Sequence, residues 1–209
     1  MFSLLVLMVL GCLSQEAWSC TCGQRHPQSV YCDSAFVIKA KFVAQKEMKN
    51  DERLQYQVKT TKVFKAPKEL EDIQYVYTAK SDSLCGYRHA STNKSEEFLV
   101  AGYIVGQEVF INSCSFIAPW SSLSFCQKRG FMQVYAKNCD CQIKHCYQVP
   151  CEVDNKLQCL WTDPLRRMKD LYSGHQAAKW ACVHNGDDLC VWDSLKSHLY
   201  SMVTKSNSK

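Results

Sequence analysis

The residue with the most distinctive chemistry in this sequence is Cys20, because of what precedes it. Residues 2–10 and Gly11 form an apolar run without a charged side chain, and Ala17 and Ser19 are the small residues typical of a signal-peptide cleavage site. Cleavage after residue 19 makes Cys20 the first residue of the exported chain. Its α-amino nitrogen and its carbonyl oxygen are then two donors that can close a five-membered chelate ring on a divalent metal.

An amino terminus of this kind fits the zinc of another protein. Its pKa is about 7.7–8.0, so a useful fraction is neutral at physiological pH. A catalytic zinc with three protein ligands keeps a fourth position open for water. A cysteine held at that position displaces the water. The alternative is that Cys20 is only a disulfide partner exposed by cleavage, and its position alone leaves both interpretations open.

The cysteine content predicts a disulfide framework. The sequence has 14 cysteines in 209 residues, and 13 remain once residues 1–19 are removed. In an exported protein such cysteines pair with one another, and the odd number leaves one outside the framework. The Cys20-x-Cys22 and Cys139-x-Cys141 spacings are not those of zinc knuckles, so we expect no cofactor or metal of the protein's own.

No enzyme motif is present. The six histidines are scattered, none lies in an H-E-x-x-H motif, and the sequence has no G-x-S-x-G motif or glycine-rich phosphate loop. The carboxylates lie in polar connections, which disfavours a paired-acid active site. The sequence therefore predicts a protein that is not an enzyme.

The elements that must position Cys20 are predicted to be mainly strands. Five alternating or β-branched runs lie between polar connections, at residues 35–43, 56–64, 73–78, 98–105 and 109–114. Because five short strands must also hide their edges, we expect a small closed or partly closed barrel.

Two helices are expected to flank these strands. The first follows Pro119, is capped by Ser121 or Ser122, and places Leu123, Cys126 and Gln127 at helical spacing. The second opens at Pro164 and has an apolar stripe of Leu165, Met168, Leu171 and Tyr172.

The cysteines also divide the chain into two units. Seven cysteines, Cys126 among them, lie in residues 20–139, and six are crowded into residues 141–190. No flexible linker separates the groups, so we expect a unit of residues 20–139 to abut a disulfide-stapled subdomain and tail of residues 141–209. We expect the second unit to supply a partner surface and the first unit to carry the activity.

Charge and hydropathy limit the partners. The formal net charge is +5, which is far from a nucleic-acid signature. No later run approaches 18 apolar residues, so no membrane span is expected and the product is secreted to the extracellular space. The series Lys59, Lys62, Lys65 and Lys68 indicates either a solvated sheet face or a sulfated-polysaccharide site. Asn93 begins a glycosylation sequon in a polar connection.

Several motifs resemble those of the tissue inhibitors of metalloproteinases. They are residues 20–22 (CTC), 26–28 (HPQ), 37–42 (VIKAKF), 83–86 (SLCG) and 159–163 (CLWTD). Residues 93–99, 114–120 and 189–195 are most similar to type-1 members of that family. The resemblance covers all of the chain after residue 19.

The resemblance implies a fold and a disulfide pattern that spacing alone left open. The fold is a five-stranded, OB-like (netrin-like) barrel followed by a small disulfide-rich subdomain. The implied pairs are Cys20–Cys85, Cys22–Cys114, Cys32–Cys139, Cys141–Cys190, Cys146–Cys151 and Cys159–Cys182. Cys126 remains unpaired, and its apolar neighbours favour a buried thiol over an intermolecular bridge.

The resemblance also implies a mechanism of protease inhibition. Cys20 would coordinate the catalytic zinc of a matrix metalloproteinase in a 1:1 complex, and Thr21 would enter the S1′ pocket. Cys22 and Gly23 would continue along the primed side of the cleft, and the unprimed side would be filled by Ser83, Leu84, Cys85 and Gly86. A progelatinase is the implied partner of the second unit.

Two features bear on that mechanism. The family usually has prolines after the second cysteine, whereas this chain has Gly23, Gln24 and Arg25, which leave the backbone freer. A different class also remains open, namely a matrix-binding or receptor-binding signalling module on the same barrel. N-terminal sequencing separates the two, because an inhibitor of this kind must begin at Cys20.

Overall fold

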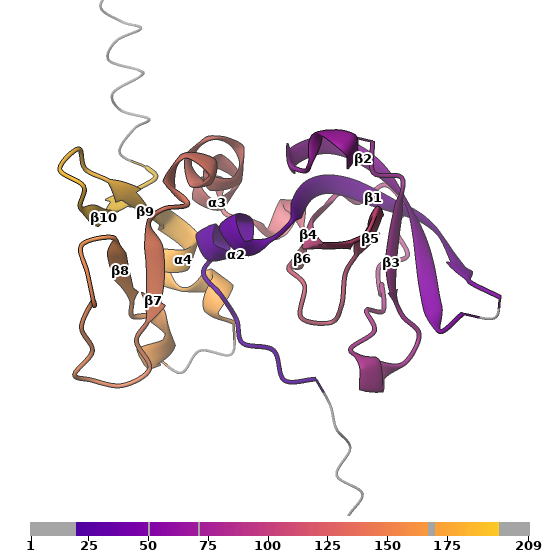
Figure 1. Ribbon diagram of the computed structural model, residues 1–209, viewed down its shortest axis with the longest axis horizontal. Coiled ribbons are helices and arrows are strands. Elements are labelled where there is room, and N and C mark those ends of the chain that lie inside the picture. The colour runs from indigo at the N-terminus through magenta and orange to yellow at the C-terminus, as the bar shows by residue number, and fades with distance from the viewer. Residues whose placement is uncertain (1–19, 50, 71, 167–169, 197–209) are drawn as a thin grey trace, which may run out of the picture.

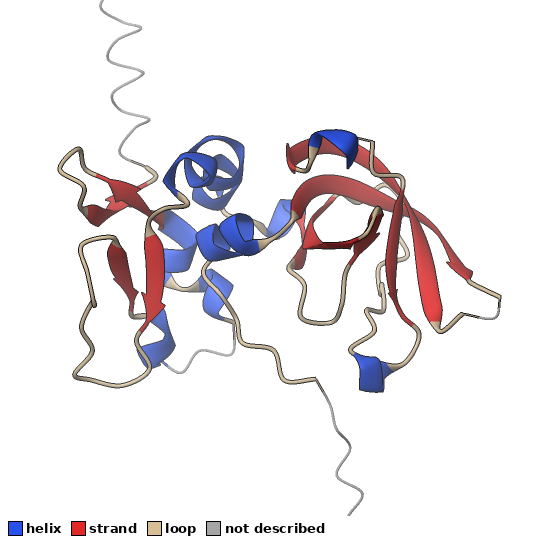
Figure 2. Ribbon diagram, viewed as in Figure 1, coloured by secondary structure: helices blue, strands red, loops and turns tan. Residues whose placement is uncertain are grey.

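The computed structural model describes residues 20–49, 51–70, 72–166 and 170–196. The expected signal peptide and most of the C-terminal tail lie outside these residues. A mainly β unit and a smaller unit with short strands lie side by side, and helices lie between them (Figures 1 and 2). Within the described residues, no helix is long and apolar enough to cross a membrane.

Five strands of the first unit close into a ring. They are β1 (Phe36–Glu47), β2 (Arg53–Lys65), β3 (Tyr75–Ala79), β4 (Phe98–Val105) and β5 (Glu108–Phe110). The order around the ring is β1-β2-β3-β5-β4, and β4 pairs antiparallel with β1 to complete it. A sixth strand, β6 (Ile117–Pro119), continues the sheet from β4.

Alternating side chains fill the interior of this ring. On β1, Phe36, Ile38 and Phe42 are buried, and Leu54 and Tyr56 of β2 pack in the same cluster. Exposed polar residues alternate with the buried ones along β2. This period of two puts one face of each strand into the core and the other toward solvent.

A second core joins the two units. Val37 of β1 and Leu99 of β4 point away from the ring interior and pack with Ala181 and Leu195, which come from the second unit. Helix α2 (Pro27–Asp33) contributes to the same cluster. Each Å² of apolar surface removed from water contributes about 25 cal/mol of stability, so this shared core stabilises the contact between the two units.

The predicted helix after Pro119 begins later than expected. Its cap is Ser124, not Ser121 or Ser122, and α3 spans Phe125–Arg129. The Ser124 hydroxyl accepts from the Gln127 amide and the Gln127 side chain accepts from the Ser124 amide, which forms a capping box. Short turns then continue the chain as η4 (Gly130–Val134) and η5 (Tyr135–Asn138).

The second unit contains two small sheets. One pairs β7 (Gln142–His145) with β8 (Gln158–Trp161), and the other pairs β9 (Trp180–His184) with β10 (Cys190–Ser194). Helix α4 (His175–Lys179) lies between them in sequence. The sequence analysis identified neither the four strands nor helices α2 and α4, because each is only four to seven residues long.

The helix predicted from Pro164 is not continuous. The described residues form two 3-10 turns, η6 (Asp163–Arg166) and η7 (Leu171–Ser173), and Met168 lies outside the described residues. Three further 3-10 turns belong to the first unit, namely η1 (Lys68–Leu70), η2 (Asp82–Leu84) and η3 (Trp120–Ser122).

The described residues contain six disulfides, which join the same pairs that the family resemblance implies. Three lie within residues 20–139 and three within residues 141–190. Cys126 is free and only 2% exposed, in a cluster with Leu123, Phe131 and Tyr135.

The burial of Cys126 predicts an unreactive thiol. Titration of the native protein with a thiol reagent should detect almost no free group, and one group should react after denaturation with the disulfides intact. Cys126→Ser should leave the native result unchanged. A covalent dimer on a non-reducing gel that disappears with this substitution would contradict the prediction.

Candidate functional site

Two disulfides tie the start of the described chain to the first unit. Cys20 is bonded to Cys85 with a Cα–Cα distance of 5.6 Å, and Cys22 to Cys114 with a distance of 5.1 Å. Between and beyond them the chain is irregular, and Thr21, Cys22 and Gly23 are exposed. In Figure 1 this segment runs from α2 along the lower side of the molecule. We call residues 20–23 and 83–86 together the ridge.

The second part of the ridge begins in the 3-10 turn η2 and continues through Cys85 and Gly86. The Ser81 hydroxyl caps this turn by accepting from the Ser83 amide at 3.2 Å. Leu84, the last residue of this turn, is 62% exposed, so its side chain is available for contact.

The backbone at Cys85 and Gly86 is tightly constrained. Cys85 has a φ of 59°, a left-handed conformation that costs a residue with a Cβ about 1–2 kcal/mol. A Cβ on Gly86 would lie 2.2 Å from the Ala79 carbonyl oxygen, so only glycine fits there. The Ser113 amide donates to the Cys85 carbonyl at 2.8 Å. These contacts hold Cys85 where its sulfur meets that of Cys20.

His26 anchors the other end of the N-terminal segment. It is fully buried and caps helix α2, where its Nδ1 accepts from the Gln28 amide at 3.2 Å. Because Nδ1 accepts, Nε2 carries the proton and faces the Gln176 carbonyl at 3.4 Å. The imidazole ring also packs on Trp161 and Trp192 of the second unit, at centroid distances of 5.6 and 5.2 Å.

This environment keeps His26 neutral. Burial lowers its pKa from 6.5 to about 3, since the charged form would lose its hydration among apolar rings. The Gln176 carbonyl and the Asp163 carboxylate favour the charged form but do not offset the burial.

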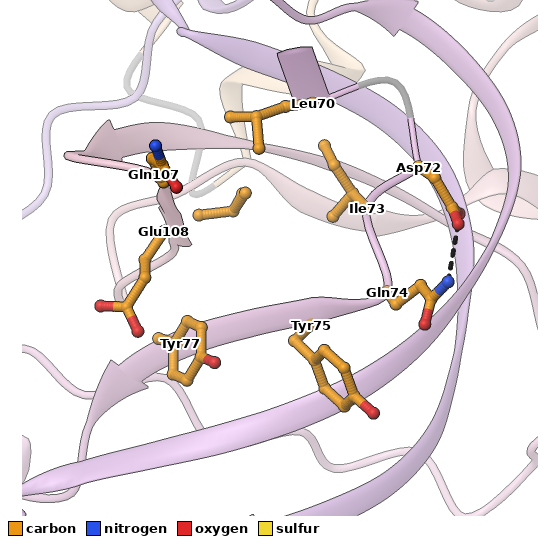
Figure 3. A pocket seen from close by; sticks show the side chains of 9 residues that line it. Leu70, Asp72, Ile73, Gln74, Tyr75, Tyr77, Gln107 and Glu108 are labelled. Carbon is orange, nitrogen blue, oxygen red and sulfur yellow. Dashed lines mark hydrogen bonds between the residues drawn. The ribbon is translucent and has the colours of Figure 1, made fainter.

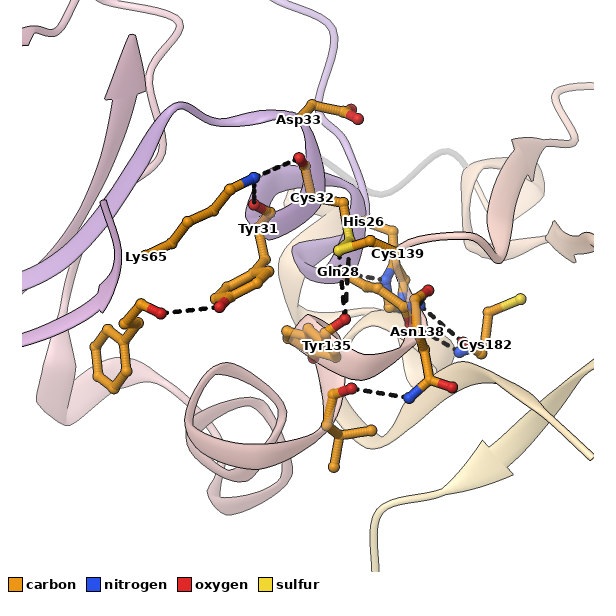
Figure 4. The surroundings of a disulfide bond; sticks show 12 residues. His26, Gln28, Tyr31, Cys32, Asp33, Lys65, Tyr135, Asn138, Cys139 and Cys182 are labelled. Carbon is orange, nitrogen blue, oxygen red and sulfur yellow. Dashed lines mark hydrogen bonds between the residues drawn. A yellow bond between two sulfur atoms is a disulfide. The ribbon is translucent and has the colours of Figure 1, made fainter. Parts of the chain in front are cut away.

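Gln28 makes the polar connection between the units. Its side-chain nitrogen donates to the carbonyls of Asn138 and Cys182 at 2.9 and 2.7 Å, and its oxygen accepts from the Cys182 amide at 2.8 Å (Figure 4). All of these groups lie near the Cys32–Cys139 disulfide. A buried amide with three satisfied hydrogen bonds fixes the direction in which the N-terminal segment leaves α2.

Other clusters in the described residues do not form a comparable site. Cys141, His184 and Cys190 converge within 4.8 Å, but the two sulfurs are bonded to each other and only the imidazole could bind a metal. A cavity of about 250 Å³ opens beside β3 and β5, where Glu108 pairs with Arg53 and Asp72 accepts from Gln74 (Figure 3). Its acidic groups therefore already have partners.

The structure brings the predicted site residues together. Cys20 and Cys85 join the two parts of the ridge, and Cys22 is bonded to Cys114, which lies outside it. Asn93 is exposed in the connection before β4. The sequence analysis missed His26 and Gln28 as anchors. Their signal was the H-P-Q motif itself, which places a helix cap, a proline at the first helical position and a buried amide in succession.

Fold and ridge together define a disulfide-held protein whose exposed N-terminal segment is bonded to the first unit. A family model described as "Tissue inhibitor of metalloproteinase" matches residues 18–192. The chain therefore belongs to this family, whose members are inhibitors and not enzymes.

Named relatives agree with this assignment. Metalloproteinase inhibitor 3 of Xenopus laevis is 37% identical over 188 residues, covering 89% of this chain and 86% of the relative. Metalloproteinase inhibitor 4 of Mus musculus is 38% identical over 190 residues, with 87% and 83% covered. Metalloproteinase inhibitor 2 of Homo sapiens is 36% identical over 195 residues, with 89% and 86% covered.

The buried His26 predicts a loss of stability in mild acid. Between pH 6.5 and about 3 the unfolded chain binds a proton at this position that the folded chain does not. The free energy of unfolding is therefore highest above pH 6.5, where His26 is neutral in both states. It decreases as the pH falls below 6.5, by at most about 1.4 kcal/mol per pH unit. His26→Asn, which retains a capping oxygen but does not titrate, should flatten this dependence.

Thermal midpoints of both proteins between pH 7.5 and 4.5 test the prediction. Burial also lowers the pKa of His89 and His145, so the variant should keep part of the slope. Parallel curves for the two proteins would show that His26 is not the group responsible.

Proposed function

We propose that this chain is a secreted inhibitor of zinc metalloendopeptidases of the matrix metalloproteinase class. The α-amine and carbonyl oxygen of Cys20 bind the catalytic zinc of the target in a 1:1 complex. The observation that carries the proposal is the ridge, in which one disulfide joins an exposed N-terminal segment to residues 83–86 and a second joins it to Cys114. Family membership and the names of the relatives support it.

The proposed chemistry depends on cleavage before Cys20. A free amine has a lone pair for zinc once it is neutral, whereas an amide nitrogen does not. The chelate occupies the position where the protease would otherwise activate water. Since no residue precedes Cys20, no peptide bond lies at the zinc to be cut.

Rigidity makes this arrangement an inhibitor. A peptide of the same sequence would lose conformational entropy on entering a cleft, at a cost of about 0.5–1.5 kcal/mol per immobilised side chain. The Cys20–Cys85 and Cys22–Cys114 bonds restrict the segment before binding. Extended-strand recognition is therefore combined with pre-organisation.

The neighbouring residues fill the rest of the cleft. Thr21 enters the S1′ pocket, and Cys22 and Gly23 follow along the primed side. Ser83, Leu84, Cys85 and Gly86 take the unprimed side. The exposure of Thr21 and of Leu84 in the free protein supports these roles, because both side chains are available for contact.

The finer assignments are part of the same proposal. The closed five-strand ring is an OB-like, netrin-like barrel, and the chain is a type-1 member on the motifs at residues 93–99, 114–120 and 189–195. Residues 1–19 direct secretion, and Asn93 carries a glycan. The second unit, residues 141–209, binds a progelatinase.

A sulfated polysaccharide is a second partner, favoured by one observation. Lys41 lies opposite Lys59 on β1 and β2, although like charges in cross-strand pairs are destabilising. A polyanion relieves that repulsion. Lys39 lies opposite Lys62 but already pairs with Glu97 at 3.0 Å. Lys65 does not belong to this surface, because its ammonium donates to the carbonyls of Tyr31 and Cys32.

The polysaccharide proposal predicts salt-dependent binding to heparin. Replacing both Lys41 and Lys59 by Gln should lower the salt concentration needed for elution and flatten the salt dependence. Replacing Lys94 and Lys144, which lie elsewhere, is the matched control. If both variants elute at the same salt concentration, Lys41 and Lys59 are not part of the binding surface.

Blocking the amine of Cys20 should abolish inhibition. One added N-terminal alanine converts the amine into an amide and places atoms where the zinc would lie. We expect inhibition of a matrix metalloproteinase to fall by at least a hundredfold, since each tenfold corresponds to about 1.4 kcal/mol. The control carries the same alanine after Lys209, and disulfide mapping confirms that both proteins fold.

Thr21 should set selectivity among proteases. Thr21→Gly removes the side chain proposed for S1′ and leaves the chelate intact, so inhibition constants should rise unequally across a panel of metalloproteinases. Thr21→Ser, which loses one methyl group, should give smaller changes. If Thr21→Gly leaves the inhibition constants nearly unchanged across the panel, the Thr21 side chain does not enter the S1′ pocket.

A further inference from the structure

We propose that the second unit holds the base of the ridge through Gln24, and that this contact determines how tightly the ridge binds a metalloproteinase. The main-chain amide of Leu171 donates to Oε1 of Gln24 at 2.6 Å, across 147 positions of the sequence. Gln24 is thus a positioning residue, and the second unit takes part in inhibition. This inference rests on the proposed function.

The ridge needs support at this position. After the Cys22–Cys114 disulfide, the next fully buried residue is His26. In between, a Cβ on Gly23 would meet nothing within 4 Å, so the chain there lies in open space. Glycine has the freest backbone of any residue, and Gln24 lacks the fixed φ of proline. A tertiary contact must supply the restraint that the local sequence does not.

The Leu171 amide is well suited to supply it. Leu171 is the first residue of η7, where a main-chain N–H has no partner within the helix. Asp170 caps the turn by accepting from the Tyr172 amide at 2.9 Å. The Leu171 N–H is therefore directed outward. The half-buried Gln24 side chain accepts a hydrogen bond from it.

Turn η7 is itself anchored to the first unit. The Tyr172 ring packs edge-on against the ring of the buried Phe116, with 4.7 Å between the centroids. The main-chain carbonyl of Tyr172 accepts a hydrogen bond from the Gln127 side chain at 2.9 Å. Burial raises the pKa of the Tyr172 hydroxyl, and a hydrogen bond with the Arg25 backbone acts in the opposite direction. Leu171 and Tyr172 thus contact two consecutive residues of the N-terminal segment.

These contacts form a continuous path from the core to the ridge. Phe116 and Gln127 position η7, η7 positions Gln24 and Arg25, and these two residues position the chain that follows Cys22. One hydrogen bond contributes about 0.5–1.5 kcal/mol. Its loss should therefore weaken inhibition by about two- to tenfold.

Two substitutions remove the hydrogen bond from opposite sides. Gln24→Ala removes the acceptor. Leu171→Pro removes the donor without touching the N-terminal segment, and proline is tolerated at the first position of a helical turn, after the extended Asp170. Leu171→Ala is the matched control, because it shortens the same side chain but keeps the N–H.

Inhibition constants against a matrix metalloproteinase catalytic domain are measured for the native chain, the three variants and the Gln24→Ala/Leu171→Pro double variant. We expect two- to tenfold weaker inhibition for Gln24→Ala and for Leu171→Pro, near-native inhibition for Leu171→Ala, and no further loss in the double variant. Amide hydrogen exchange of residues 21–24 in the free inhibitor should accelerate in the variants that lose the hydrogen bond. Exchange in the strands of the ring should not change.

Additive losses in the double variant, or equal losses for Leu171→Pro and Leu171→Ala, would overturn the proposal. Exchange at residues 21–24 that does not change would do the same. A native chain that inhibits no metalloproteinase would overturn the proposed function instead. In that case the exchange rates still decide whether η7 holds the ridge.

Discussion

The bond between Cys20 and Cys85 is the constraint on which the arrangement depends. Chain termini are normally poorly ordered, yet the proposed mechanism needs the first residue of the exported chain at a defined place. A covalent bond to Cys85 provides that place, but only because Cys85 is itself held in a left-handed conformation beside Gly86. The unit that contains the ring of strands thus holds Cys20 in place through Cys85.

The strain at Cys85 is supported from several directions. The Ala79 carbonyl lies so close that only glycine fits at position 86, and the Ser113 amide holds the Cys85 carbonyl. Cys114, next to Ser113, bonds to Cys22. Both disulfides of the ridge therefore end in two loops that are joined by the Ser113–Cys85 hydrogen bond. Strained backbone persists where its surroundings over-determine it.

The two units share a core and buried hydrogen bonds, so they pack as one structure and are not merely linked domains. Their shared core includes Val37, Leu99 and Ala181, and the buried polar groups of His26 and Gln28 find partners across the same boundary. Separating the units would leave those groups without partners, at about 1–3 kcal/mol for each. The N-terminal segment is therefore supported by residues from both units.

The sequence by itself predicted much of the strand layout and offered a hypothesis for the chemistry. Cys20 after a predicted signal peptide offered a metal-binding amine as one of two interpretations. Alternating residues located β1, β2 and β4 closely, since burial of one face imposes a period of two. It located short elements poorly. β6 and the strands of the second unit are too short for a period to show, and the stripe from Leu165 to Tyr172 is divided between two separate turns.

Only the tertiary structure decided how the ridge is held. The left-handed Cys85, the neutral buried His26 and the bond from Leu171 to Gln24 all depend on residues far apart in the chain. Propensity and periodicity describe interactions between near neighbours. They carry no information about which distant carbonyl, ring or amide will stand opposite a given side chain, and that is settled when the two units pack together.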